Sequence, residues 1–404
     1  LGKNLNKIKR VVFLDKNTPP HIFTLIIVSG LGALSMSIFL SSILEMSLYF
    51  DKSYALMQLS ISLYLLSTAI FQIIAGPLSD RFGRRLITLS SVIMFILASL
   101  GCFFSTQFEF FIFFRILQAS VAAGFLMSRV IIRDITSESE AASMIGYVTM
   151  GMSIIPLFAP GFGGLIHMYL GWPSIFLIMA LLGLFLLYLV FKDLGETKIV
   201  KKNRNKKYLG SNFELLKETK FWGYTLTLAF SAGTFFSFLG GAPYVATKIY
   251  NLNSIVSGLV MGFPAAGYFL GNYLSGRYSK FYGINFMALR GILLVIFGML
   301  TCLIFITLYK DTPYFFFGLC SFVGLGNGLI IPNASVGVLS VNQNLSGTAG
   351  GIGNAVMIGT GAILASFASY VLENHNSSDY LVLIMLSSGI LSLVFLYTLV
   401  LRNK

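Results

Sequence analysis

The sequence predicts an all-α membrane protein with 12 transmembrane helices in two pseudo-symmetric six-helix halves. The 404-residue chain is 56% hydrophobic and only 11% charged, whereas soluble domains carry about 25% charged residues. Apolar runs of about 20 residues, long enough to cross a bilayer core of about 30 Å as helices, recur from end to end. One long polar segment divides these runs into two equal sets. Transmembrane β-strands would instead give alternating segments of about 10 residues.

The apolar runs define the expected spans in chain order. They cover residues 21–48, 54–76, 86–106, 109–132, 141–168, 173–192, 221–248, 254–276, 286–309, 314–338, 346–371 and 380–401. Short turns separate them, except for the lysine-rich segment 193–220. We therefore expect a basic N-terminus (1–20), a first half (21–192), a linker (193–220), a second half (221–401) and a short tail (402–404).

The distribution of basic residues predicts the orientation. Outer loops hold only Lys52, Lys248 and Lys310 when the N-terminus is placed in the cytoplasm, and most of the 28 Lys and Arg residues then lie inside. This is the positive-inside pattern of a bacterial inner (plasma) membrane protein with both termini cytoplasmic. It accounts for the net charge of +13 without nucleic acid as a partner, and it makes the linker a candidate for contact with anionic lipid headgroups.

A short repeat supports the division into halves. The pattern Gly76-x-x-Ser79-x-x-x-Gly83 follows the second span, and Gly276-x-x-Ser279-x-x-x-Gly283 follows the eighth. Parallel repeats of this kind build several transporter folds, with the substrate site near the midplane between the repeats.

Three motifs resemble those of the major facilitator superfamily. Gly76-Pro-Leu-Ser-Asp80-Arg81-Phe-Gly83-Arg84-Arg85 resembles the superfamily's loop motif between helices 2 and 3. Arg115 and Gln118 resemble its second motif, with Ala119 where glycine is usual. The fifth span resembles the glycine-proline motif of proton-coupled antiporters through Gly151, Pro156, Pro160, Gly163 and Gly164, with Ala159 where glycine is commonest. The resemblance implies the superfamily's fold and transport by alternating access.

Further stretches narrow the resemblance to the Bcr/CflA-type drug exporters. They include 58–63, 128–134, 242–245 and 331–334. The resemblance implies proton-coupled export of small lipophilic or zwitterionic compounds. The chain departs from that group at Ser37, where an acidic residue often stands. Three possibilities therefore stay open for coupling: Glu45, an acid elsewhere, or no coupled ion.

Arg115, Gln118, Glu45 and Ser37 form the expected polar core. Glu45 lies eight residues beyond Ser37, about 12 Å further along a helix, which places it near the outer mouth as either a solvated interfacial acid or a proton carrier. A charge within the membrane must face the bundle interior and find an acceptor. Arg115 either pins its helix to a neighbour, with Glu45 as a candidate partner, or serves a proton site or an anionic group of the substrate.

The remaining candidate residues fall into three groups. We expect a conformational latch that holds the cytoplasmic side closed, formed by Gly76, Asp80, Arg81, Gly83, Arg84 and Arg85. Helix packing or bending is expected of Gly151, Pro156, Pro160, Gly163 and Gly164. Candidate cavity residues, for each of which simple packing is the alternative, are Tyr64, Phe71, Tyr147, Phe235, Phe238, Tyr244, Tyr268 and Asn333.

The sequence lacks the signals of several other functions. There is no phosphate-binding loop with a Lys-Ser/Thr pair, so ATP is not the expected energy source. Intramembrane acids and histidines are too sparse for a catalytic constellation, and His21, His167 and His375 form no metal-like cluster. We expect a monomeric transporter that is not an enzyme and needs no cofactor or metal. The alternatives are an exporter or permease for a specific metabolite or siderophore, and a non-transporting receptor on the same fold.

Overall fold

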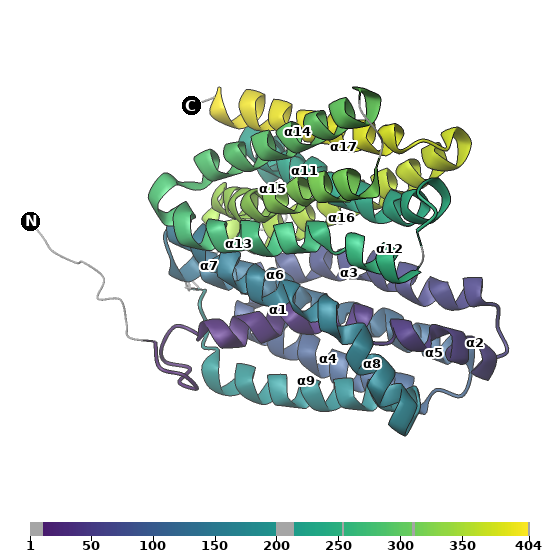
Figure 1. Cartoon of the computed structure of the whole chain (residues 1–404). Helices are drawn as coiled ribbons and strands as arrows, with labels where there is room; N and C mark the ends of the chain where they lie inside the picture. Colours follow the sequence, from purple (N-terminus) through teal and green to yellow (C-terminus); the bar gives the residue numbers. More distant parts are fainter. Residues whose placement is uncertain (1–10, 199–213, 253, 309–311, 403–404) are drawn as a thin grey trace, which may run out of the picture. The chain divides into compact units, whose positions relative to one another are not determined.

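The computed structural model describes residues 11–198, 214–252, 254–308 and 312–402. Helices build these ranges, and no strand occurs within them (Figure 1). Three predicted features lie wholly or partly outside the described residues: the start of the basic N-terminus, most of the lysine-rich linker, and Lys310. The helices group into two compact units, which are described separately here.

Unit 1 comprises residues up to Phe71, Leu78–Ile135 and Ile155–Lys202. Its helices are α1 (Ile22–Ser37), α2 (Ile43–Tyr49), α3 (Tyr54–Phe82, apart from residues 72–77), α4 (Arg84–Phe104), α5 (Phe108–Gln118), α6 (Ala122–Ile135), α8 (Ile155–Leu170) and α9 (Pro173–Asp193). Helix α4 packs against α9 and α5, and α1 packs against α6 and α8. Short 3₁₀ turns connect α1 with α2 and α5 with α6.

Unit 2 comprises residues 72–77 of α3, Thr136–Ile154 and the chain from Asn203 onward. Its helices are α7 (Glu138–Ser153), α11 (Thr219–Tyr244), α12 (Ser254–Val260), α13 (Phe263–Tyr282), α14 (Ile284–Leu308), α15 (Pro313–Ser340), α16 (Ser346–His375) and α17 (Ser378–Phe395). Helix α11 packs against α16 and α17, while α13 packs against α15 and α7. Two elements of the expected first half, α7 and residues 72–77, thus group with the helices of the second half.

The predicted all-helical membrane fold is confirmed, but some expected spans are interrupted. Within the described residues, ten helices are long and apolar enough to cross a membrane. The first expected span is broken between α1 and α2, and the eighth between α12 and α13. The fifth breaks at Ile154, one residue before α8 begins. Pro156 then stands in the first turn of α8, where the missing proline N–H leaves no helical hydrogen bond unmade.

Candidate functional site

The first candidate site in unit 1 is a charged cluster at the junction of α3 and α4. Arg84 is 0% exposed. Its Nη1 donates to Asp80 Oδ1 at 2.8 Å and to Ser79 Oγ at 2.9 Å, and its Nε donates to Asp134 Oδ2 at 2.9 Å. Lys198 Nζ lies 3.2 Å from Asp80 Oδ1. The cluster thus pairs two cations with two carboxylates, and these partners offset the cost of burying the Arg84 charge.

Glu196 holds the start of α4 within the same cluster. Its Oε1 accepts from the Arg84 backbone N–H at 2.9 Å, and its Oε2 accepts from the Arg85 backbone N–H at 3.2 Å. A carboxylate in this place satisfies two backbone donors of the first turn and lies at the positive end of the helix dipole. The segment after α9 is therefore fastened to the loop between α3 and α4.

Gly83 makes the turn between α3 and α4 possible. Its φ of 98° and ψ of 160° lie in a region that only glycine adopts readily. Its N–H donates to Ser79 O at 3.1 Å and ends α3. In the repeat of this motif, Gly283 has φ 79° and ψ 164°, and its N–H donates to Ser279 O at 2.9 Å. The repeat predicted from sequence therefore has one capping geometry at both places.

The other predicted latch residues occupy different surroundings. Arg81 is exposed with its guanidinium 5.0 Å from the Phe82 ring centre. Arg85 donates to the Phe191 carbonyl at 2.9 Å. Gly76 is buried in unit 2, where a Cβ atom would lie 2.4 Å from the Gly347 carbonyl oxygen of α16. Only glycine permits this close approach of α3 to the first turn of α16.

The second candidate site is the polar core of unit 1 around Arg115. This residue of α5 is 1% exposed, and Gln118 is 0% exposed. Arg115 Nη1 donates to Gln118 Oε1 and lies 3.4 Å from both the carbonyl and the hydroxyl oxygen of Ser35. Gln118 Nε2 in turn donates to Ser99 Oγ at 2.7 Å. The structure thus joins Arg115 and Gln118 as the motif predicts, and it adds α1 and α4 to the network.

Aromatic rings enclose the Arg115 guanidinium. Its central carbon lies 4.3 Å from the Phe39 ring centre, 4.6 Å from that of Tyr64 and 6.0 Å from that of Phe176. Attraction between a desolvated cation and an aromatic face is worth about 2 kcal/mol. The Tyr64 hydroxyl donates to the Gly32 carbonyl at 3.2 Å, which fixes the ring. We call Phe39, Tyr64 and Phe176 the aromatic cage.

Two residues of the expected polar core, Ser37 and Glu45, do not contact Arg115. Ser37 does not reach Arg115, because its hydroxyl donates back to the Ala33 carbonyl at 2.8 Å; Ser35 is the residue of α1 that contacts the guanidinium. Glu45 does not pair with Arg115 either. Its carboxylate lies 2.6 Å from His167 Nε2, with the Glu45 side chain 59% exposed. This agrees with an interfacial position for Glu45 and gives it a titratable partner.

The glycine-proline residues divide between close packing and open positions. A Cβ on Gly163 would lie 1.6 Å from the Ile38 carbonyl oxygen, so α8 contacts the end of α1 backbone to backbone. Pro160 lies inside α8 and Gly151 inside α7, both partly exposed, as is Gly164. The side chain of Pro156 lies outside the described part of the structure.

The candidate cavity residues are divided between the two units. Tyr64 belongs to the aromatic cage, and Phe71 is half-buried on the same helix. In unit 2, the Phe235 and Tyr268 rings stack with centres 6.3 Å apart, and Phe238 packs edge-on to Phe317. Tyr244 instead reaches Asn376 at an exposed helix end. Phe238 and Tyr244 therefore have the surroundings of packing residues.

Two further candidates contact α13 within unit 2. Asn333 is fully buried and donates to Ser275 Oγ at 3.0 Å and to the Leu329 carbonyl at 2.7 Å. This is the hydrogen bond between helices expected for a polar residue at depth. The half-buried Tyr147 ring lies against Gly276, where a Cβ would come within 2.8 Å of the ring.

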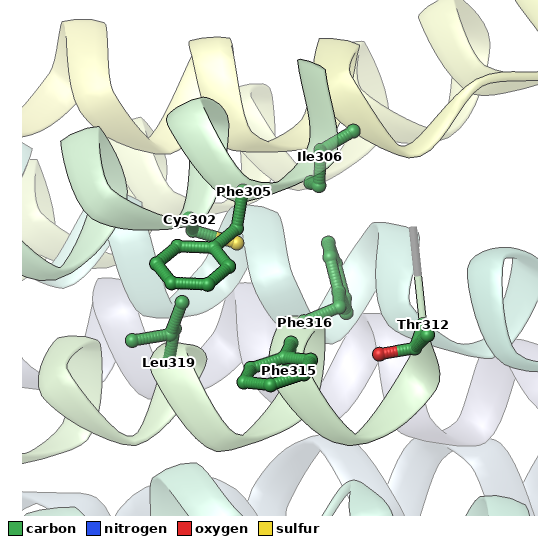
Figure 2. Close-up of a pocket in the computed structure, with 7 residues that line it drawn as sticks. All are labelled: Cys302, Phe305, Ile306, Thr312, Phe315, Phe316 and Leu319. Atoms are coloured by element: carbon green, nitrogen blue, oxygen red, sulfur yellow. The ribbon is translucent and has the colours of Figure 1, made fainter. Parts of the chain in front are cut away.

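A recess between the end of α14 and the start of α15 is separate from these residues. Figure 2 shows its lining of Cys302, Phe305, Ile306, Thr312, Phe315, Phe316 and Leu319. The lining is apolar except for the Thr312 hydroxyl and the Cys302 thiol. No predicted substrate-contact residue contributes to it.

Comparison with known proteins identifies the class of protein. The sequence model of the Major Facilitator Superfamily matches residues 25–366. The chain therefore belongs to this superfamily and is a multi-pass membrane transporter. Among solved structures, the proton:xylose symporter XylE bound to 6-bromo-6-deoxy-D-glucose superposes with a TM-score of 0.75 over 94% of this chain and 96% of that chain. At 14% sequence identity, this likeness shows the fold.

Two bacterial proteins are similar to this chain in sequence. An uncharacterized MFS-type transporter of Bacillus subtilis, YdgK, is 31% identical over 265 residues, which are 63% of this chain and 65% of that protein. A bicyclomycin resistance protein homolog of Haemophilus influenzae is 29% identical over 362 residues, which are 88% of this chain and 90% of that protein.

Several residues of the two sites were not predicted from the sequence. They are Asp134, Glu196 and Lys198 in the charged cluster, Ser35, Phe39 and Phe176 around Arg115, and His167 beside Glu45. Each is far from its partner along the chain. For Asp134 and Lys198 the sequence does offer one indication of pairing: each is a charge near the end of an apolar run, where it needs a charged partner or water.

Proposed function

We propose that the protein exports small lipophilic or zwitterionic compounds across the bacterial inner membrane in exchange for protons. The observation that carries the proposal is the buried guanidinium of Arg115, which lies within a set of apolar helices and is enclosed by aromatic rings. A charge at such a position marks a substrate or ion pathway. The likeness to the bicyclomycin resistance protein homolog over most of the chain favours drug-type cargo.

The charged cluster of Asp80, Arg84, Asp134, Glu196 and Lys198 serves this transport as a latch on the cytoplasmic side. The basic residues flanking the spans support that orientation, with both termini inside. The cluster joins the ends of α3, α6 and α9 through side chains that all carry charge. An array of this kind has one well-paired arrangement, so it stabilises one conformation of unit 1 against those that separate the charges.

Glu45 and His167 are the proposed proton-coupling pair. Position 37 offers no acid, and Arg115 has no carboxylate partner in the part of the chain that the structure describes. Carboxylate and imidazole groups are the side chains that form proton relays in pumps and transporters. The pair joins α2 to α8, the helix that carries Pro156, Pro160, Gly163 and Gly164 of the glycine-proline motif.

Transport in inside-out vesicles tests the function. Export predicts that bicyclomycin, offered with a panel of lipophilic compounds, accumulates inside vesicles that contain the protein and leaves them when a protonophore is added. Accumulation that persists with the protonophore would contradict proton coupling. No accumulation of any panel member, with correctly inserted protein, would contradict drug export.

A further inference from the structure

Arg115 has one edge to which no group of the described residues makes a hydrogen bond. A guanidinium carries five N–H donors on three nitrogens. Nη1 is engaged by Gln118 and Ser35, whereas Nε and Nη2 are buried and make no hydrogen bond in the described structure. Leaving a buried donor of a charged group unpaired is unfavourable, because the donor loses its hydrogen bonds to water, and an external acceptor would recover that free energy.

The geometry of this edge fits one kind of acceptor. Nε–H and the adjacent Nη2–H point the same way in the guanidinium plane, which is the fork that binds both oxygens of a carboxylate. Phe39 and Tyr64 lie over the guanidinium at 4.3 and 4.6 Å. A partner must therefore approach in the plane of the group, between rings, as a flat anion does.

The charge balance points to an acceptor from outside the chain. Within the described residues, the groups that contact Arg115 are all neutral: the amide of Gln118, the hydroxyl and carbonyl of Ser35, and the rings of the aromatic cage. Arg84, the other fully buried arginine of unit 1, has two carboxylates. Among the residues that the structure describes, no anion thus compensates the cost of burying the Arg115 charge.

Resting on the proposed export function, we propose that the Nε–Nη2 edge of Arg115 binds the carboxylate of the transported compound. The cargo class is then a small lipophilic compound with one carboxylate, either an aromatic acid or a zwitterion. Since Arg115 is 1% exposed, the compound reaches this edge when the aromatic cage opens, and the rings then pack against its apolar part. Release of the cargo restores the neutral surroundings seen here.

Binding to the purified full-length protein in detergent tests the assignment. The probes are benzoate, its neutral isostere benzamide, and chloride. Benzoate should bind at least tenfold more tightly than benzamide, as expected from a charged hydrogen-bonded pair. Arg115→Lys keeps the charge but loses the fork, and should weaken benzoate binding by a similar factor. The matched control is Arg290→Lys, an exposed arginine that also lies over a ring (Phe286, 4.9 Å), which should leave binding unchanged.

Each outcome decides the assignment. Equal binding of benzoate and benzamide by the wild-type protein would overturn it, even if the Arg115 variant does not fold. Unaltered benzoate binding by a folded Arg115→Lys protein would do the same. Chloride that competes fully with benzoate at equal concentration would make the site one for any small anion and overturn the carboxylate assignment. Export of neutral drugs is measured separately in vesicles, so its failure would contradict the proposed function and leave the carboxylate preference standing.

Discussion

Replacing Gly83 by alanine should destabilise unit 1 through two separate effects. A side chain at φ 98° and ψ 160° imposes backbone strain of about 1–3 kcal/mol. The new Cβ would also lie 2.3 Å from a carboxylate oxygen of Glu196 and displace it from the N–H groups at the start of α4. Losing that helix cap should cost about 0.5–2 kcal/mol more.

Gly283→Ala is the matched control for Gly83→Ala. Gly283 ends α13 with nearly the same backbone angles, φ 79° and ψ 164°, and a Cβ there would meet nothing within 4 Å. It should therefore show the strain alone. The assay is thermal unfolding of the purified protein in detergent, where an excess loss of 1 kcal/mol in a unit of 150–250 residues corresponds to a melting temperature lower by about 2–4 °C.

A double-mutant cycle with Glu196→Gln isolates the cap. If the excess loss at Gly83 comes from the displaced carboxylate, Gly83→Ala combined with Glu196→Gln should cost less than the sum of the two single changes. Equal losses in the Gly83 and Gly283 variants would refute the role of Glu196. So would strict additivity in the cycle, because it would mean that the two residues act independently.

Three further predictions concern transport and the aromatic cage. Asp80→Asn should lower the export rate in vesicles at least tenfold with membrane insertion intact. The control Lys280→Met should keep the rate, because the ion pair of Lys280 is exposed. Full activity of the Asp80 variant would contradict the latch assignment. Glu45→Gln and His167→Gln should each abolish substrate-induced proton movement in proteoliposomes, and normal acidification in both would move coupling elsewhere. Tyr64→Phe should lower the free energy of unfolding by about 1 kcal/mol through the lost hydrogen bond to Gly32 but keep benzoate binding. Tyr64→Leu should lose both this hydrogen bond and benzoate binding. A Leu variant that binds benzoate normally would show that the ring has no part in binding.

The fold could be predicted from sequence because the bilayer imposes length and polarity on each span. Runs of apolar residues contain enough information for the helical membrane class. The repeat of Gly83 at Gly283 was equally readable, since both positions need a backbone that only glycine adopts easily. The helix breaks at Ile38–Ser42 and at Met261–Gly262 could not be predicted from the sequence. Hydropathy continues across them, so the apolar pattern contains no signal for either break.

The site was only half predictable for the same reason. Arg115 and Gln118 are separated by one helical turn, so their contact follows from local geometry. Their further partners are Ser35 on α1 and Phe39 just after it, about 80 residues earlier. Likewise Glu196 reaches α4 from beyond α9, more than 100 residues later. Residue spacing does not indicate either contact, and a single sequence contains no other information on which distant residues lie close together.

The two fully buried arginines of unit 1, Arg84 and Arg115, show how burial, partner charge and role are connected. Arg84 is surrounded by formal charges of opposite sign, Asp80 and Asp134, so removing either carboxylate takes away one of the two anions that offset the buried cation. Arg115 has only dipoles and ring faces, which stabilise a cation without neutralising it. A residue of the first kind has its full set of partners in the resting protein and suits a fixed contact. A residue of the second kind gains most when an anion arrives, so its affinity depends on whether cargo is present, which transport requires of a binding residue.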